Sequence, residues 1–146
     1  MADVEREKSS GWSGFTRFSI DDLAALQPAL TIIMPLVGQR YWKLYYAAKA
    51  GNWDLAFYQL QQVHDLMETG MVTRPQYAKD LQAFMEGYLE PIEEAIEDRD
   101  WTAFQEAYND GIIGSRMYHD RNKRPYIQWK LPDYPPPDLD STPMDS

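Results

Sequence analysis

Apolar side chains recur along most of the chain at steps of three and four residues, the period of an amphipathic α-helix. In the first such segment, residues 29–50, six positions alternate steps of four and three, as in the seam of a helix bundle. These positions are Leu30, Met34, Val37, Tyr41, Leu44 and Ala48. Similar stripes occupy residues 53–69, 75–98 and 101–121. The pattern therefore predicts an all-α protein, an antiparallel four-helix bundle over residues 19–123.

Capping residues and a proline set the expected ends of these helices. Asn52 and Asp100 are placed as N-caps of the second and fourth helices. Gly51 and Gly70 are placed to end the first and second helices. Pro91 interrupts the third helix, where we expect a kink that splays the helix and opens space inside the bundle.

The two ends of the chain differ from its helical middle. Residues 1–18 are charged and rich in Ser and Gly, which predicts an N-terminal arm that is either flexible or laid over the bundle. Residues 124–146 are rich in proline, including a run at 135–137, which forbids helix. We predict that this segment is an extended strap packed across the bundle, with a frayed end from Asp138 onward.

The first helix is apolar on two faces. Opposite its core stripe lie four further large side chains, Ile32, Leu36, Trp42 and Tyr46. Either the N-terminal arm covers this second face or a second copy of the chain does. A pairing of the helix with its own copy is the simplest closed solution, so we predict a homodimer through this helix.

Composition and charge exclude several classes of partner. The net charge is -9 and no run of Lys or Arg occurs, which argues against nucleic acid and against an acidic membrane surface. No segment approaches the ~20 apolar residues of a membrane span, and the start lacks the apolar core of a signal peptide, so we expect a cytoplasmic protein. The chain has no cysteine, so disulfides, thiolate metal sites and cysteine nucleophiles are excluded.

Carboxylates are plentiful in the third helix, at Glu90, Glu93, Glu94, Glu97 and Asp98. A di-metal site in a bundle needs inward Glu-x-x-His pairs, and neither histidine has a glutamate three residues before it. We therefore interpret the run as a solvated face and predict no metal site.

His119 is the most informative polar residue. It ends a stripe on the fourth helix formed by Trp101, Phe104, Tyr108, Ile112, Ser115 and His119. The spacing places the imidazole on the same inward face as the aromatic rings. A histidine in this position is either a satisfied core or capping residue or a group that acts on a ligand.

The segments 41–47 (YWKLYYA) and 50–56 (AGNWDLA) resemble the first helical hairpin of small four-helix-bundle c-type cytochromes, which are similar to cytochrome c′. In that family the last helix ends in Cys-x-x-Cys-His, followed by a Pro-aromatic-Ile segment and a Pro-rich tail. Here Ser115 and Tyr118 stand at the two cysteine positions, and His119 stands at the histidine. The chain then continues with Pro125-Tyr126-Ile127 and with Pro135-Pro136. The resemblance covers about residues 27–137.

The resemblance implies a bundle with a haem cavity, but without the two cysteines haem cannot be attached covalently. A void of that size must be filled by side chains or by a ligand. We predict that a small aromatic, phenolic compound fills it. The predicted catalytic residues are His119 as base, with Tyr118 and Tyr108. The predicted substrate-binding residues are Arg40, Tyr41, Tyr45, Phe104, Ser115 and Tyr126.

Three functions fit these residues. The first is a cofactor-independent lyase or isomerase acting on the aromatic compound by Tyr/His acid-base chemistry. The second is a protein that binds haem or another redox group non-covalently, with His119 as the remaining candidate axial ligand. The third is a non-catalytic binding or structural bundle in which the tyrosines close the cavity.

Overall fold

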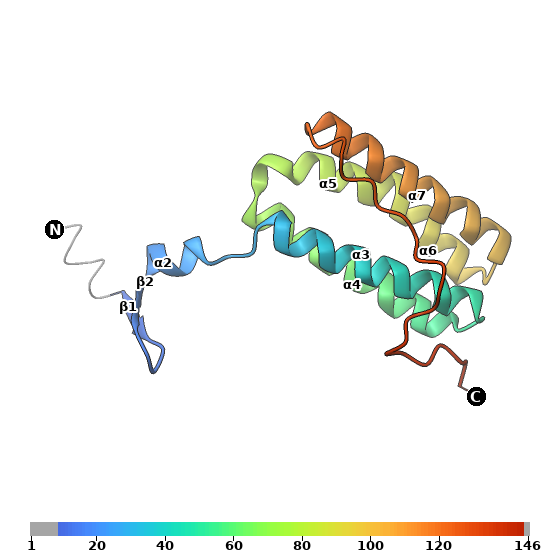
Figure 1. Ribbon diagram of the computed structural model, residues 1–146, viewed down its shortest axis with the longest axis horizontal. Helices are drawn as coiled ribbons and strands as arrows, with labels where there is room; N and C mark the ends of the chain where they lie inside the picture. The colour runs from blue at the N-terminus through green and yellow to red at the C-terminus, as the bar shows by residue number, and fades with distance from the viewer. Residues whose placement is uncertain (1–8, 145–146) are drawn as a thin grey trace.

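The computed structural model describes residues 9–144, and most of these are helical (Figure 1). The prediction of a mainly helical chain is confirmed, although a small two-stranded sheet precedes the helices. The elements are β1 (Ser10–Trp12), β2 (Arg17–Ser19), α2 (Ile20–Ala25), α3 (Leu30–Lys49), α4 (Trp53–Thr73), the 3₁₀ turn η1 (Pro75–Tyr77), α5 (Ala78–Phe84), the π-helical segment η2 (Met85–Leu89), α6 (Glu90–Glu97) and α7 (Trp101–Arg121).

Side-chain caps account for the starts of α4 and α7. The Asn52 side chain accepts a hydrogen bond from the Leu55 N–H, and the Asp100 side chain accepts one from the Ala103 N–H. Each cap satisfies one of the N–H groups that have no partner within the helix. Gly51, at φ 78°, ends α3 in the left-handed conformation that glycine adopts without strain.

Helix α4 does not end at Gly70, so the predicted end near residue 69 is wrong. Gly70 is buried, and a Cβ there would lie 2.9 Å from Leu30 and 3.4 Å from Leu81. The missing side chain therefore serves close packing inside the molecule, and the helix continues to Thr73. The Thr73 hydroxyl then donates to the carbonyl of Pro28, at 2.8 Å.

The third predicted helix consists of four consecutive pieces, η1, α5, η2 and α6. Pro91 has no N–H, and its ring would clash with the carbonyl four residues earlier in a regular α-helix. The preceding turn is widened instead, and the N–H of Glu90 donates to the carbonyl of Met85, five residues back. The π-helical turn just before Pro91 thus accommodates the proline within the helix.

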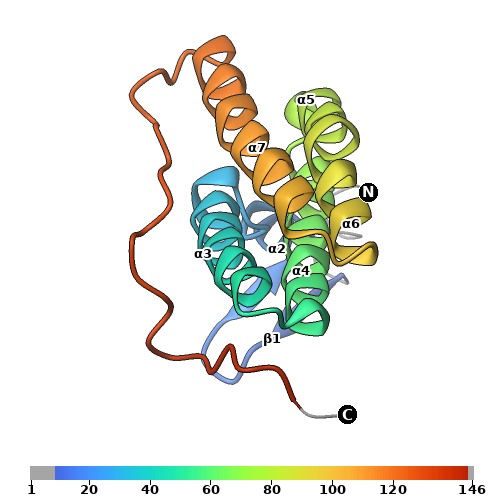
Figure 2. The ribbon, with the colours of Figure 1, turned by 90° about the vertical axis from the view of Figure 1, so that its right-hand side faces the viewer.

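Helix α3 packs along α4 and α6 packs along α7, while α4 contacts α6 and α3 contacts α7 (Figure 2). Every one of these helices contributes buried apolar side chains to one cluster. Its fully buried large members are Tyr108, Phe104, Ile33, Leu44, Leu60, Leu89, Ile92 and Val63.

From Arg124 the chain runs extended along α3 (Figure 2). The indole N–H of Trp42 donates to the carbonyl of Tyr134 at 2.9 Å, and the Tyr46 hydroxyl donates to the carbonyl of Pro132 at 2.9 Å. Lys43 forms an ion pair with Asp138 at 3.0 Å. The C-terminal tail, not the N-terminal arm, therefore covers this half of the second apolar face of α3.

The strands β1 and β2 and helix α2 form the part of the arm that is described, and Figure 1 shows them extending away from the longer helices. Ser19 caps α2 in a reciprocal capping box with Asp22. Large apolar side chains of this segment face solvent: Trp12, Phe15, Ile20, Leu23 and Leu26. Residues 1–8 and 145–146, which belong to the predicted arm and frayed end, lie outside the described residues.

Candidate functional site

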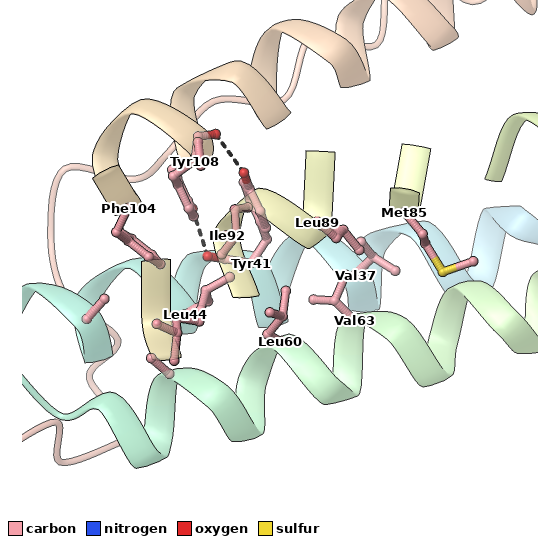
Figure 3. Packing of buried hydrophobic residues seen from close by; sticks show 14 of the residues in the cluster. Val37, Tyr41, Leu44, Leu60, Val63, Met85, Leu89, Ile92, Phe104 and Tyr108 are labelled. Atoms are coloured by element: carbon pink, nitrogen blue, oxygen red, sulfur yellow. Dashed lines mark hydrogen bonds between the residues drawn. The ribbon is translucent and has the colours of Figure 1, made fainter. Parts of the chain in front are cut away.

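Two tyrosines join α3 to α7 at the centre of the molecule. The Tyr41 hydroxyl donates to the backbone carbonyl of Tyr108 at 2.6 Å, and the Tyr108 hydroxyl donates to the backbone carbonyl of Tyr41 at 2.7 Å (Figure 3). Their rings are nearly parallel, at 8°, with centroids 4.0 Å apart. Stacked rings at this distance are in van der Waals contact, so no molecule fits between them.

Burial raises the pKa of both hydroxyls. For Tyr41, desolvation acts first and the negative charge of Asp110 adds to it; for Tyr108, desolvation acts first and the neighbouring tyrosines add to it. Both phenols therefore stay protonated and remain hydrogen-bond donors at neutral pH. Because each donates its one proton to a backbone carbonyl, neither is free to donate to a ligand in this arrangement.

Further aromatic rings surround the pair. The ring centroid of Tyr45 lies 5.1 Å from that of Tyr108, and the ring centroid of Phe104 lies 5.6 Å from it. On α7, Gly111 leaves the room that the Tyr41 hydroxyl occupies, since a Cβ there would collide with it. The structure thus brings together four predicted site residues, Tyr41, Tyr45, Phe104 and Tyr108, as packed core.

His119 lies elsewhere, in the last turn of α7. It lies eleven positions after Tyr108, or about 16.5 Å along the helix axis at the α-helical rise. Its Nδ1 is 3.4 Å from the hydroxyl of Ser115, and partial burial lowers the pKa of the imidazole. The structure therefore pairs His119 with Ser115 and does not bring it to the central tyrosines.

The other predicted residues are also dispersed. Tyr118 has its ring 6.1 Å from that of Phe84, in edge-to-face contact, and Tyr126 is 74% exposed on the tail. Arg40 faces α4, where its Nη1 donates to the side-chain oxygen of Gln59 at 3.1 Å and its guanidinium lies over the ring of Tyr58.

Gln59 is the buried partner that the sequence did not reveal. It is 1% exposed, and the stripe of α4 gave no reason to place an amide in the core. Because Gln59 is neutral, it provides the Arg40 guanidinium with a hydrogen-bond acceptor but not with a negative charge.

His64 is a second polar residue of α4 whose environment the sequence did not reveal. Its Nε2 is buried and has no hydrogen-bond partner among the described residues, at the side of a surface hollow of about 390 Å³ along α4.

A further hollow, of about 240 Å³, lies between η2 and α6 on one side and α7 on the other. Its lining is Gly87, Tyr88, Pro91, Ala107, Asp110 and Ile113. The sequence signal for it was the small Gly87 four residues before the proline that widens the turn.

Within residues 9–144, none of the helices combines the length and the apolarity that a membrane span requires. In the same part of the chain no three His, Asp or Glu side chains are grouped so as to hold a metal ion.

Comparison of the chain with protein-family models, with curated proteins and with solved structures found no match. The resemblance to four-helix c-type cytochromes therefore stays a prediction from the sequence, based on the segments 41–47 and 50–56, on the position of His119 and on the proline-containing segments after it.

The lowered pKa of His119 predicts a pH dependence of stability. Between the ordinary value of about 6.5 and the lower folded value, the unfolded chain binds more protons than the folded chain. The contribution of His119 to the free energy of unfolding is therefore fully present above pH 6.5 and is lost as the pH falls through this window. In urea unfolding, the loss between pH 7.5 and pH 5.5 is expected to be larger for the wild type than for His119→Gln. Equal losses would contradict the assignment.

Proposed function

We propose that the protein is a non-catalytic binding protein, built as an antiparallel four-helix bundle on a scaffold like that of the c-type cytochromes, with its interior closed by its own tyrosines. The observation that carries this proposal is the reciprocal pairing of Tyr41 and Tyr108. Both hydroxyls are committed to backbone carbonyls and the rings are stacked, so the groups predicted to bind a ligand bind each other. Recognition then takes place on the surface.

A second candidate remains the predicted lyase or isomerase acting on an aromatic compound. It is favoured by one observation, the lowered pKa of His119, because a neutral imidazole is the form that acts as a general base. A substrate would have to reach this residue near the end of α7, away from the Tyr41 and Tyr108 hydroxyls. Tyr118, which precedes His119 in the sequence and is also a predicted catalytic residue, would then act as the general acid.

Native mass spectrometry and absorption spectroscopy of the purified protein separate these functions. The closed interior predicts a mass equal to that of the chain, no Soret band after incubation with haem, and no rise in melting temperature with a panel of phenols. Retention of an aromatic compound that His119→Ala abolishes would support the enzyme instead. A Soret band lost in the same variant would support non-covalent haem binding.

The predicted homodimer through α3 also remains a proposal, now restricted to its N-terminal half. Ile32 and Leu36 are 57% and 44% exposed, whereas Trp42 and Tyr46 bond to the tail. Two side chains bury too little for a stable interface, which takes ~800 Å² per partner, so the exposed apolar side chains of α2 would have to join them.

Light scattering is expected to give twice the chain mass of 17.0 kDa at micromolar concentration. Replacing Ile32 and Leu36 by Glu should give monomers, because the charges would be buried against each other across the two-fold axis. Thr31→Glu, on an exposed neighbouring position, is the control and should leave the mass unchanged. A wild-type mass of 17.0 kDa would rule out the dimer.

A further inference from the structure

The hollow between η2, α6 and α7 is an apolar recess on the surface. Gly87 and Ala107 give it depth because they carry little or no side chain, and Pro91 borders it on α6. Tyr88 forms one wall and extends across to Gly114, where a Cβ would overlap its ring. The recess is thus shaped by small residues on both helices and by one aromatic ring that is held in place.

Apolar surface continues from the recess along α7. Ile113 borders it and Met117 follows one turn later on the same face, and these side chains are 56% and 57% exposed. We call the recess, together with the exposed side chains of Ile113 and Met117, the groove. The C-terminal tail runs along α3 (Figure 2) and forms hydrogen bonds with Trp42 and Tyr46, so it does not cover the groove.

The groove is bordered by acidic groups. Asp110 lines the recess itself. Glu90 is exposed next to Pro91, Glu106 is exposed next to Ala107, and Glu94 is exposed one turn after Pro91. None of these four carboxylates forms an ion pair with a residue of the described chain. Helix α6 itself contains no Lys or Arg. The groove therefore combines apolar side chains with four carboxylates that form no ion pair within the described chain. Arg116 of α7, beside Met117, is exposed and is the one basic residue next to these side chains in the sequence of α6 or α7.

We propose that this groove docks a basic, amphipathic segment of another protein. One apolar side chain of the partner occupies the recess, and Lys or Arg residues on either side of it meet Asp110, Glu94 and Glu106. The volume of about 240 Å³ is below the ~300–1,000 Å³ of small-molecule sites and suits a single large side chain. The charge complementarity selects a cationic partner and rejects nucleic acid. This inference rests on the proposed role as a binding protein and names the partner class.

Fluorescence anisotropy with a labelled amphipathic peptide of Lys and Leu residues tests the proposal on the full chain. Saturable binding that weakens with salt is expected, because the rim charges are solvent-exposed. A peptide with Ser in place of Leu and one with Glu in place of Lys should both fail to bind. Absence of saturable binding up to about 1 mM peptide, the weakest affinity worth assigning to a site, would overturn the proposal.

Matched variants separate the groove from general attraction to an acidic protein. Glu94→Gln with Asp110→Asn should weaken binding about fivefold to tenfold, as expected for two exposed ion pairs. The control, Asp65→Asn with Glu68→Gln, removes the same charge from exposed positions of α4 and should change binding less than twofold.

Gly87→Leu tests the recess itself. Nothing lies within 4 Å of a Cβ at this position, so the variant should fold and should block the recess with its own side chain. Loss of peptide binding is expected. Unchanged binding, or equal weakening by the two charge variants, would overturn the proposal. These binding results do not depend on whether the interior of the protein holds a ligand. That question is tested separately by native mass spectrometry and by the Soret band.

Discussion

Tyr108→Ala is expected to lower the free energy of unfolding by about 3–5 kcal/mol, the range for removing a buried aromatic side chain. The Tyr108 ring is fully buried and stacks on Tyr41, and its hydroxyl satisfies the Tyr41 carbonyl. The substitution removes the ring and also leaves the space between α3 and α7 unfilled. Urea unfolding followed by circular dichroism measures the change.

Two control variants divide this effect into its parts. Tyr108→Phe keeps the ring and loses only the hydrogen bond, so it should cost about 1 kcal/mol. Tyr126→Ala removes the same side chain from a position that is 74% exposed and should change the stability by less than about 0.5 kcal/mol. If Tyr108→Ala cost no more than Tyr108→Phe, the pair would not close the interior, and the proposal of a non-catalytic protein would lose its main support.

Tyr108→Ala also bears on function. A protein that lacks an interior site can acquire one when an aromatic ring is deleted, because apolar cavities of this kind bind small aromatic molecules. Addition of phenol or indole should therefore raise the melting temperature of Tyr108→Ala but not that of the wild type. A rise of equal size in the wild type would favour the aromatic-ligand hypothesis.

The helical part of the fold could be predicted because its signals are local. The cap at Asp100 and the stripe from Trp101 to His119 predicted α7 with the observed bounds, Trp101–Arg121. Gly70 misled the prediction because the same residue type serves helix ends and close helix packing, and only the contact with Leu30 distinguishes these uses. The hairpin of β1 and β2 joins strands of three residues each, with one large apolar residue per strand, so the sequence has no periodic pattern that predicts them.

The candidate site was less predictable because its residues meet across helices. Spacing along α7 places Tyr108 and His119 on related faces, but it does not tell which residue of α3 lies opposite each of them. Tyr41 and Tyr108 are 67 residues apart in the chain, and their mutual hydrogen bonds depend on the register of α3 against α7. Nor does the spacing of Gly111 and Gly114 on α7 tell what lies beside them, where the structure has the side chains of Tyr41 and Tyr88.

Gly114→Ala is expected to destabilise the protein by about 1–3 kcal/mol, although Gly→Ala within a helix ordinarily stabilises by up to about 1 kcal/mol. The added Cβ would overlap three atoms of the Tyr88 ring, which packs over Gly114 from η2. Tyr88 also packs against Phe84, with ring centroids 5.2 Å apart, so it cannot move without disturbing a second ring. The free energy of unfolding from urea titration measures the change.

Gly87→Ala is the matched control, because it adds the same methyl group to the same helix pair at a position with open space around its Cβ. It should be neutral or stabilise by up to about 1 kcal/mol. In a Tyr88→Ala background, Gly114→Ala should lose its cost, since the ring that it meets is gone. A penalty that persists in that background would have to come from the α7 backbone and would remove Tyr88 as its cause. A penalty that disappears would show that Gly114 is the residue that lets Tyr88 lie between η2 and α7 and form the wall of the docking recess.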